Sequence, residues 1–161
     1  FGNGHCLRGY QRGRKVEESV NFLAFYKEQF GLKQADAGMY SPLVLAYIGD
    51  AVYELMIRTM IVNHGNMQVN KLHKKSSSLV KAEAQANLIK ILRPHLTEEE
   101  NAVFKRGRNA RSVTVAKNAT MTDYRMATGF EALMGWLFLS ERFERMTELT
   151  VIGLKEIGEL P

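Results

Sequence analysis

Two long apolar segments limit what this chain of 161 residues can fold into. The first, SPLVLAYIGDAVYELMIRTMIVNHG, covers residues 41–65, and the second, DYRMATGFEALMGWLFL, covers residues 123–139. Both are too long for an ordinary strand, and no alternating strand pattern of useful length occurs elsewhere. Leu, Ala, Glu, Lys and Met are frequent, and the three prolines are few, which favours helix. The sequence therefore predicts an all-α fold.

Local signals predict where the first apolar helix begins and ends. Ser41 is a good N-cap, Pro42 suits the first helical position, and Gly65 is a typical C-terminal stop. Because this helix is apolar on nearly every side, we expect it to be the central, buried helix of the domain.

Five further segments have helical patterns. We expect Asn66 to cap the helix that follows the first apolar one, and Thr97 and Glu100 have the spacing of a capping box. The other three helices are expected within residues 16–31, 81–93 and 141–157, whereas residues 110–122 have the composition of a loop.

Length and composition indicate one domain without a membrane segment. Residues 1–15 are rich in Gly and basic residues and are interpreted as a flexible extension, and residues 16–161 are interpreted as the domain. No run of 18 apolar residues exists, so we expect no membrane-spanning helix. A single cysteine, Cys6, excludes an internal disulfide framework.

Positive charge is concentrated in two blocks. The net charge is +5, and neither residues 55–82 nor residues 101–122 contain a single Asp or Glu. Each block carries five Lys or Arg residues, which is what a phosphate-binding surface requires. Two solvated helix faces would give the same pattern, so charge alone leaves both interpretations open.

Asp50 and Glu131 each lie in the middle of one of the two apolar helices. Asp50 and Glu131 would be costly to bury unless each had a partner, a cation or an opening to solvent. If the two helices packed with these acids together, a divalent cation between them would remove the repulsion, and oxygen ligands suit Mg²⁺ or Mn²⁺. Alternatively, each acid pairs with a nearby base such as Arg58 or Arg125.

Small residues flank both acids. These residues are Ala46 and Gly49 beside Asp50, and Gly129, Ala132 and Gly135 beside Glu131. We expect them to leave room for a ligand to approach the carboxylates. A divalent metal next to phosphate-binding residues indicates phosphodiester chemistry.

Several ordered motifs resemble the ribonuclease III domain family. LAYIGDAVYEL resembles the signature helix of that family, and TGFEALMGWLFL resembles its second acidic helix. LHKKSS and FKRGRNAR, at their distances from these helices, resemble the Mini-ribonuclease III branch, which lacks a double-stranded RNA-binding domain. The resemblance covers about residues 40–145 and implies a single helical endonuclease domain.

The resemblance implies roles for the acids. Asp50 and Glu131 fall on the catalytic, metal-binding acids of the family, for which Mg²⁺ or Mn²⁺ is expected. Larger members carry two more acids where this chain has Ala46 and Thr128, which leaves one-metal and two-metal schemes open. Glu54 either compensates for these missing acids or orders a base or water at the rim of the site.

The resemblance also implies partners. A homodimer with two cutting centres would cleave both strands of double-stranded RNA. The expected substrate is a large-subunit ribosomal RNA precursor, presented by a ribosomal protein in the bacterial cytoplasm, with a plastid location as the alternative. RNA contacts are expected from both basic blocks, through Lys74, Lys75, Ser76 and a mobile loop holding Arg106, Arg108, Arg111 and Lys117. The competing hypothesis is a catalytically silent RNA-binding or ribosome-assembly module on the same fold.

Overall fold

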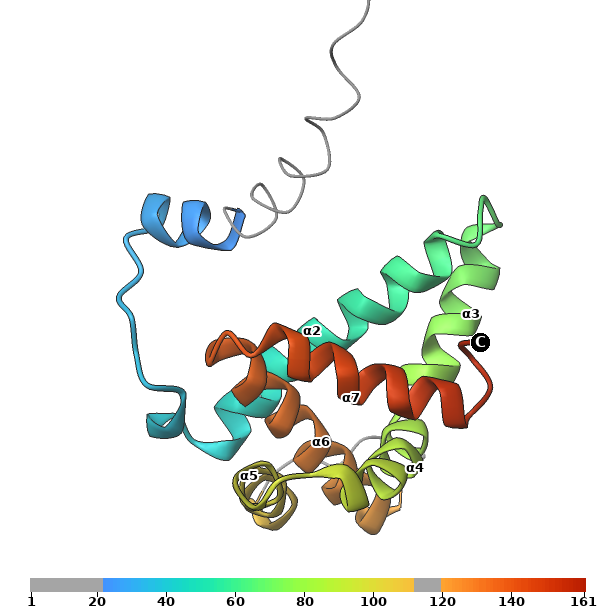
Figure 1. The fold of residues 1–161 in the computed structure, drawn as a ribbon. Coiled ribbons are helices and arrows are strands. Elements are labelled where there is room, and N and C mark those ends of the chain that lie inside the picture. Colours follow the sequence, from blue (N-terminus) through green and yellow to red (C-terminus); the bar gives the residue numbers. More distant parts are fainter. Residues whose placement is uncertain (1–21, 112–119) are drawn as a thin grey trace, which may run out of the picture. The chain divides into compact units, whose positions relative to one another are not determined.

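The computed structural model describes residues 22–111 and 120–161 and separates the chain into two compact units, Phe1–Ala35 and Asp36–Pro161 (Figure 1). In the first unit, residues 22–29 are helical, and Gly31 follows them with a φ of 62°, which glycine adopts at little cost. This agrees with the helix expected to end near residue 31. The extension expected for residues 1–15 lies outside the described residues.

The second unit is built from helices alone in its described residues, which confirms the all-α prediction. In chain order its elements are η1 (Ala37–Met39), α2 (Pro42–Val62), α3 (Val69–Val80), α4 (Ala82–Leu92), η2 (Arg93–His95), α5 (Glu98–Asn109), α6 (Met121–Leu139) and α7 (Phe143–Glu156). No helix among the described residues is long and apolar enough to cross a membrane.

The predicted caps are confirmed at two helices and wrong at a third. The Ser41 hydroxyl accepts a hydrogen bond from the Val44 amide at the start of α2. Thr97 and Glu100 form both bonds of the capping box of α5. The expected cap at Asn66 is wrong, because α3 begins three residues later, at Val69, without any side-chain cap.

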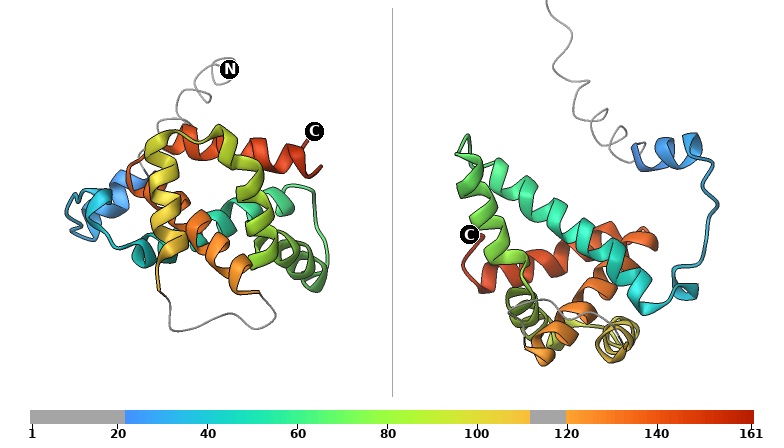
Figure 2. Two further views of the ribbon diagram at one scale, coloured as in Figure 1. Left: turned by 90° about the horizontal axis from the view of Figure 1, so that it is seen from below. Right: turned by 180° about the vertical axis from the view of Figure 1, so that it is seen from behind.

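The central helix is α6, and not α2 as expected. All residues of α6 from Met126 to Leu137 are buried except Glu131, which is half-buried, and α2, α4, α5 and α7 all pack against this helix. In the left view of Figure 2, α6 runs between α4 and α5. In contrast, α2 has one solvent-exposed side, on which Tyr47 and Leu55 are 83% and 66% exposed. Uniform apolarity predicted burial on all sides, but only contacts between helices show which sides are covered.

Two glycines allow α2 and α6 to approach closely. A Cβ atom on Gly49 would overlap the carbonyl oxygen of Glu131, and one on Gly135 would overlap the carbonyl oxygen of Leu45. Gly129 similarly lies against the ring and backbone of Phe104. The expectation that small residues leave room for a ligand is therefore wrong for these glycines. They leave room for helix backbone and for a core aromatic ring, and at Gly49 this brings the two acidic helices into contact.

Candidate active site

The crossing of α2 and α6 brings Asp50 and Glu131 together. Asp50 follows Gly49 directly, and Gly49 lies against the backbone of Glu131. The two side chains share a hydrogen bond, in which the neutral Glu131 carboxyl group donates to Asp50. Residues 81 positions apart thus form one pair, because the close backbone contact at Gly49 brings the two helices together next to both acids.

The surroundings raise the pKa of both acids. Burial is the main cause at Glu131, and the nearby charge of Asp50 adds to it, so that the pKa of Glu131 rises to about 8. At Asp50, burial and then the charge of Glu54 raise the pKa, whereas the hydrogen bond from Glu131 lowers it. Without a cation, this pair therefore holds a proton at neutral pH, which is typical of carboxyl groups that share one site.

The acid pair faces an open groove of about 780 Å³. Asp50 is exposed, Glu131 is half-buried, and Glu54 lies further along the same wall. The remaining lining residues belong to α2 and α6 and include Ala46, Tyr47, Tyr124 and Thr128. The groove gives a ligand direct access to Asp50.

The alternative in which each acid pairs with a base is not what the structure shows. Arg58 donates two hydrogen bonds to Glu54, from Nε at 3.0 Å and from Nη2 at 2.6 Å, and Arg125 is exposed. Among the described residues, no Lys, Arg or His forms an ion pair with Asp50 or Glu131. Glu54 thus forms an ion pair with Arg58, which is the contact expected if Glu54 orders a base at the rim.

Ala46 and Thr128 close the wall of the groove without adding a carboxylate. Ala46 is 5% exposed and Thr128 is 7% exposed, and the Thr128 hydroxyl donates to the Tyr124 carbonyl at 2.9 Å. Within the described part of the chain, no group of three or more His, Cys, Asp or Glu side chains is arranged to hold a metal ion. The acid content of the groove is thus limited to Asp50, Glu131 and the more distant Glu54.

Gln85 of α4 is a neighbour of the acid pair that the sequence analysis missed. Its side chain is fully buried and forms a hydrogen bond with the Glu131 carboxyl group. The position could have been noticed, because Gln85 shares the helical stripe of the buried residues Leu88, Ile89 and Leu92. A polar side chain on an otherwise apolar stripe needs a hydrogen-bonding partner inside the protein.

The basic residues of the second block lie partly on a helix and not on a loop. Arg106 and Arg108 belong to the last turn of α5, and Gly107 between them packs against Gly129 and Ala132 of α6. Arg106 is exposed, but Arg108 is half-buried, with its guanidinium group 5.5 Å from the centre of the Phe104 ring. Arg111 is exposed just beyond the helix, and Lys117 lies outside the described residues.

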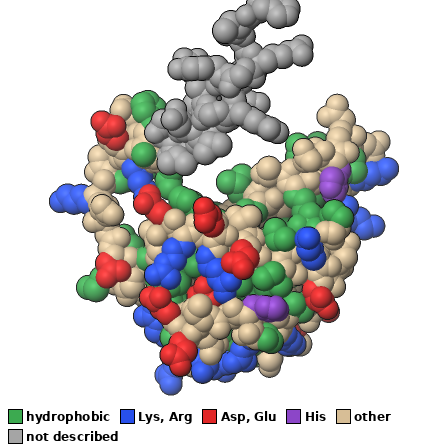
Figure 3. Space-filling model, viewed as in Figure 1, with side chains coloured by type: hydrophobic (Ala, Val, Ile, Leu, Met, Phe, Trp, Pro, Cys, Tyr) green, Lys and Arg blue, Asp and Glu red, His purple; other side chains and the backbone are tan. Residues whose placement is uncertain are grey.

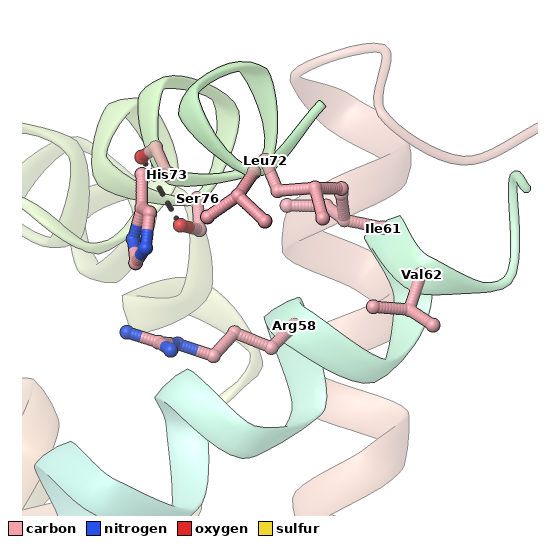
Figure 4. Close-up of a pocket in the computed structure, with 7 residues that line it drawn as sticks. Arg58, Ile61, Val62, Leu72, His73 and Ser76 are labelled. Atoms are coloured by element: carbon pink, nitrogen blue, oxygen red, sulfur yellow. Dashed lines mark hydrogen bonds between the residues drawn. The ribbon is translucent and has the colours of Figure 1, made fainter. Parts of the chain in front are cut away.

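In the first block, two lysines and a serine have different surroundings. Lys74 is exposed and Lys75 is half-buried on α3. Ser76 is 5% exposed and donates to the His73 carbonyl at 3.1 Å, so its hydroxyl group is used within the helix. Figure 4 shows Ser76 and His73 at a pocket between α2 and α3, across from Arg58. Of the three residues expected to contact RNA here, the two lysines are the more accessible.

Charges on the face of α7 are mixed and paired. Arg145 bonds Glu100 at 2.7 Å and Glu148 at 2.9 Å, and Arg142 bonds Glu99 at 3.3 Å. Figure 3 shows acidic and basic side chains interspersed on this side of the molecule. A face of this kind offers no continuous positive field to a polyanion, in contrast to α3 and the end of α5.

A helical fold with interacting carboxyl groups in an open groove between two apolar helices is that of a helical endonuclease. Residues 43–142 match the family model described as Ribonuclease III domain, and the chain belongs to this family. It is 52% identical to the Mini-ribonuclease 3 of Clostridium tetani, over 82% of this chain and 88% of that protein. It is 50% identical to the Mini-ribonuclease 3 of Enterococcus faecalis, over 73% of this chain and 90% of that protein.

A solved structure has a similar fold. The crystal structure of a protein from Fusobacterium nucleatum is similar with a TM-score of 0.68 and 32% identity, covering 76% of this chain and 96% of that one. The resemblance to the Mini-ribonuclease III branch is confirmed by these relatives, and the protein is an endoribonuclease of the ribonuclease III type.

Proposed function

We propose that this endoribonuclease cleaves double-stranded RNA at the Asp50–Glu131 pair with the help of a divalent metal ion. The observation that carries the proposal is the pair itself: two carboxyl groups from different helices share a hydrogen bond at an open groove. Among the residues that the structure describes, no Lys, Arg or His forms an ion pair with either of them. Such a pair lowers the stability of the fold as the pH rises above the ordinary carboxyl range, because both carboxyl groups have a raised pKa. Function is then the reason for its presence.

The acid pair fits a divalent cation. A cation between Asp50 and Glu131 would remove the repulsion that contributes to the raised pKa of Glu131, and the groove leaves space for water beside Asp50. A site with two carboxylates suits Mg²⁺, which usually keeps several water molecules and takes one or two protein carboxylates. When bound, Mg²⁺ supplies an activated water molecule and offsets charge on the phosphate.

The residues of the chain have separate tasks in this scheme. Asp50 and Glu131 hold the cation and fix its position relative to the scissile phosphate. Lys74 and Lys75 on one side, and Arg106, Arg108, Arg111 and Lys117 on the other, hold the RNA backbone. A-form RNA is recognised mainly through its shape, phosphates and 2′-hydroxyl groups, which long basic side chains can reach. Ser76 is buried within α3, and in this scheme it supports the position of the two lysines by packing inside the protein.

Cleavage of both strands requires two such centres, and we infer that the protein acts as a homodimer. The exposed side of α2 carries Tyr47, Ala51 and Leu55 at four-residue spacing, directly beside Asp50 and Glu54. The two large apolar side chains among them, Tyr47 and Leu55, are mostly exposed, and exposed apolar surface of this kind favours association. A second copy of this chain that covers this face would bring two acid pairs to the two strands of one duplex. Light scattering at micromolar concentration should give the mass of a dimer, and a monomer that cuts both strands would contradict this arrangement.

We infer the biological role from the resemblance to the Mini-ribonuclease III branch and the cellular location from the organisms of the named relatives. The named relatives come from bacteria, which supports a bacterial cytoplasmic enzyme over a plastid one. The substrate proposed is a precursor of the large-subunit ribosomal RNA, presented by a ribosomal protein. Comparing precursor cleavage with and without the ribosomal proteins of that subunit would test the role of a presenting partner.

The central experiment compares Asp50→Asn with Glu156→Gln, which changes an exposed acid at the end of α7. Asp50→Asn keeps the shape but removes charge, so duplex cleavage in Mg²⁺ should fall about 100- to 1000-fold. RNA binding should persist, and Glu156→Gln should leave cleavage unchanged. Wild-type protein should lose activity in EDTA. Normal cleavage by Asp50→Asn, or full activity in EDTA, would overturn the proposal and favour a different centre.

A further inference from the structure

Gln85 is a fully buried polar side chain between the acid pair and the end of α3. Its amide nitrogen donates to the carbonyl oxygen of Val80, the last residue of α3, at 3.0 Å. The same side chain forms a hydrogen bond with the Glu131 carboxyl group. Gln85 thereby connects α3, α4 and α6 at one point.

The orientation of the amide follows from its partners. The Val80 carbonyl only accepts, so the NH₂ group must face it, and the second hydrogen of that group is free to donate to Glu131. The amide oxygen Oε1 is then left buried without a partner in the described structure. An unpaired buried oxygen is unfavourable, so stability alone would select an apolar side chain at this position.

A second buried side chain, from α2, holds the same end of α3. The Tyr53 hydroxyl of α2 donates to the Leu79 carbonyl at 3.1 Å, one residue before the acceptor that Gln85 uses. Tyr53 packs edge-on against Phe130 at a centroid distance of 4.9 Å. Support of α3 is therefore shared by two residues, whereas contact with Glu131 is made by Gln85.

We propose that Gln85 is the positioning residue of the acid pair: its buried amide holds the Glu131 carboxyl group in the orientation that meets Asp50 at the groove. This inference rests on the proposed function of the pair. Glu131 lies on a rigid, buried helix, but its side chain has rotatable bonds, and a donor fixed on a second helix restricts them. Groups that orient a metal-binding side chain commonly change metal affinity or activity 10- to 100-fold when they are removed.

The test compares Gln85→Met, which keeps length and removes the donor, with Tyr53→Phe, which removes only the support of α3. Gln85→Met should weaken Mn²⁺ binding to the RNA-free protein, measured by calorimetry, about 10- to 100-fold. It should lower kcat by a similar factor and leave duplex affinity in EDTA unchanged. Tyr53→Phe should change neither Mn²⁺ affinity nor kcat. In a Glu131→Gln background, Gln85→Met should cause no further loss, because it acts through Glu131.

Four outcomes would overturn the assignment. Gln85→Met with wild-type kcat and Mn²⁺ affinity would remove the positioning role while Asp50→Asn still tests the proposed function separately. An equal loss in Tyr53→Phe would mean that α3 support explains the effect. An additive loss in the Glu131→Gln background would mean that Gln85 acts elsewhere. Failure of both Gln85→Met and Gln85→Leu to fold would make Gln85 a structural residue.

Discussion

The α2–α6 crossing and the basic residues of α3 and α5 differ in how closely their charged groups are packed. At the crossing, the backbones of α2 and α6 are in contact, two carboxyl groups lie close together, and both have a raised pKa. On α3 and α5, Lys74 and Arg106 are exposed, without such contacts. The properties of the acid pair therefore depend on close packing of α2 against α6. The basic residues need only an exposed position on the face that meets RNA. The two regions should respond differently to mutation, pH and salt.

The largest effect should come from Gly49→Ala. The added methyl group would overlap the Glu131 carbonyl oxygen, which is backbone and cannot rotate away, so α2 and α6 must separate. We expect a loss of about 3 kcal/mol in the free energy of unfolding, measured by urea denaturation. Gly38→Ala is the control, because its new Cβ atom would lie 3.3 Å from the Asp36 carboxylate and meet nothing closer. Equal stability of the two variants would mean that the crossing tolerates separation.

The second prediction concerns pH in metal-free buffer. The folded state raises the pKa of Glu131 from 4.5 to about 8, so it binds this proton more tightly than the unfolded state does. The resulting stability is complete below about pH 4.5 and is lost as the pH rises through 8. The melting temperature should therefore fall from about pH 5 to about pH 8 more steeply in the wild type than in Glu131→Gln.

Asp50→Asn sharpens the same test. Removing the charge of Asp50 lowers the pKa of Glu131, so at about pH 8 without metal the variant should melt at the wild-type temperature or higher. Differential scanning calorimetry measures both variants under one set of conditions. A loss of several kcal/mol in Asp50→Asn would instead identify Asp50 as a structural residue.

The third prediction addresses the basic region. Replacing Arg106 and Arg108 by Ala should weaken duplex binding and reduce the log–log salt slope by about one for each phosphate that is no longer neutralised. Stability should fall by less than about 1 kcal/mol, through the removal of the Arg108 guanidinium group from the Phe104 ring. A double replacement of Lys90 and Lys155, both exposed on other helices, removes the same charge and should leave the slope unchanged.

The smallest effect should follow from Glu54→Gln. Glu54 pairs with Arg58 one turn away, and both side chains are partly exposed, so the loss of stability should be about 0.5 kcal/mol or less. Cleavage should fall far less than in Asp50→Asn if Glu54 only orders Arg58 at the rim. A loss as large as that of Asp50→Asn would place Glu54 with the metal-binding acids.

Much of the local structure could be predicted from the sequence. Ser41 with Pro42, and Thr97 with Glu100, begin helices as predicted, because caps are made by residues close in the chain. The prediction for Asn66 is wrong because Gln68 takes the N-cap position of α3. The acids Asp50 and Glu131 could be chosen from the sequence as well, since a carboxylate in the middle of an apolar helix is conspicuous.

Only the tertiary structure shows which groups these residues contact. We expected Gly49 and Gly135 to leave space for a ligand, but they accommodate helix backbone. Arg106 and Arg108 were expected to contact RNA from a mobile loop, but they belong to the last turn of α5. Gln85 became visible as a partner of Glu131 only when α4 was placed against α6. The sequence by itself determined the helices and their mid-helix acids, because those depend on neighbours within a few residues. Which helix is central, which acids meet and which side chain holds them depend on contacts between distant segments, and these exist only in the folded chain.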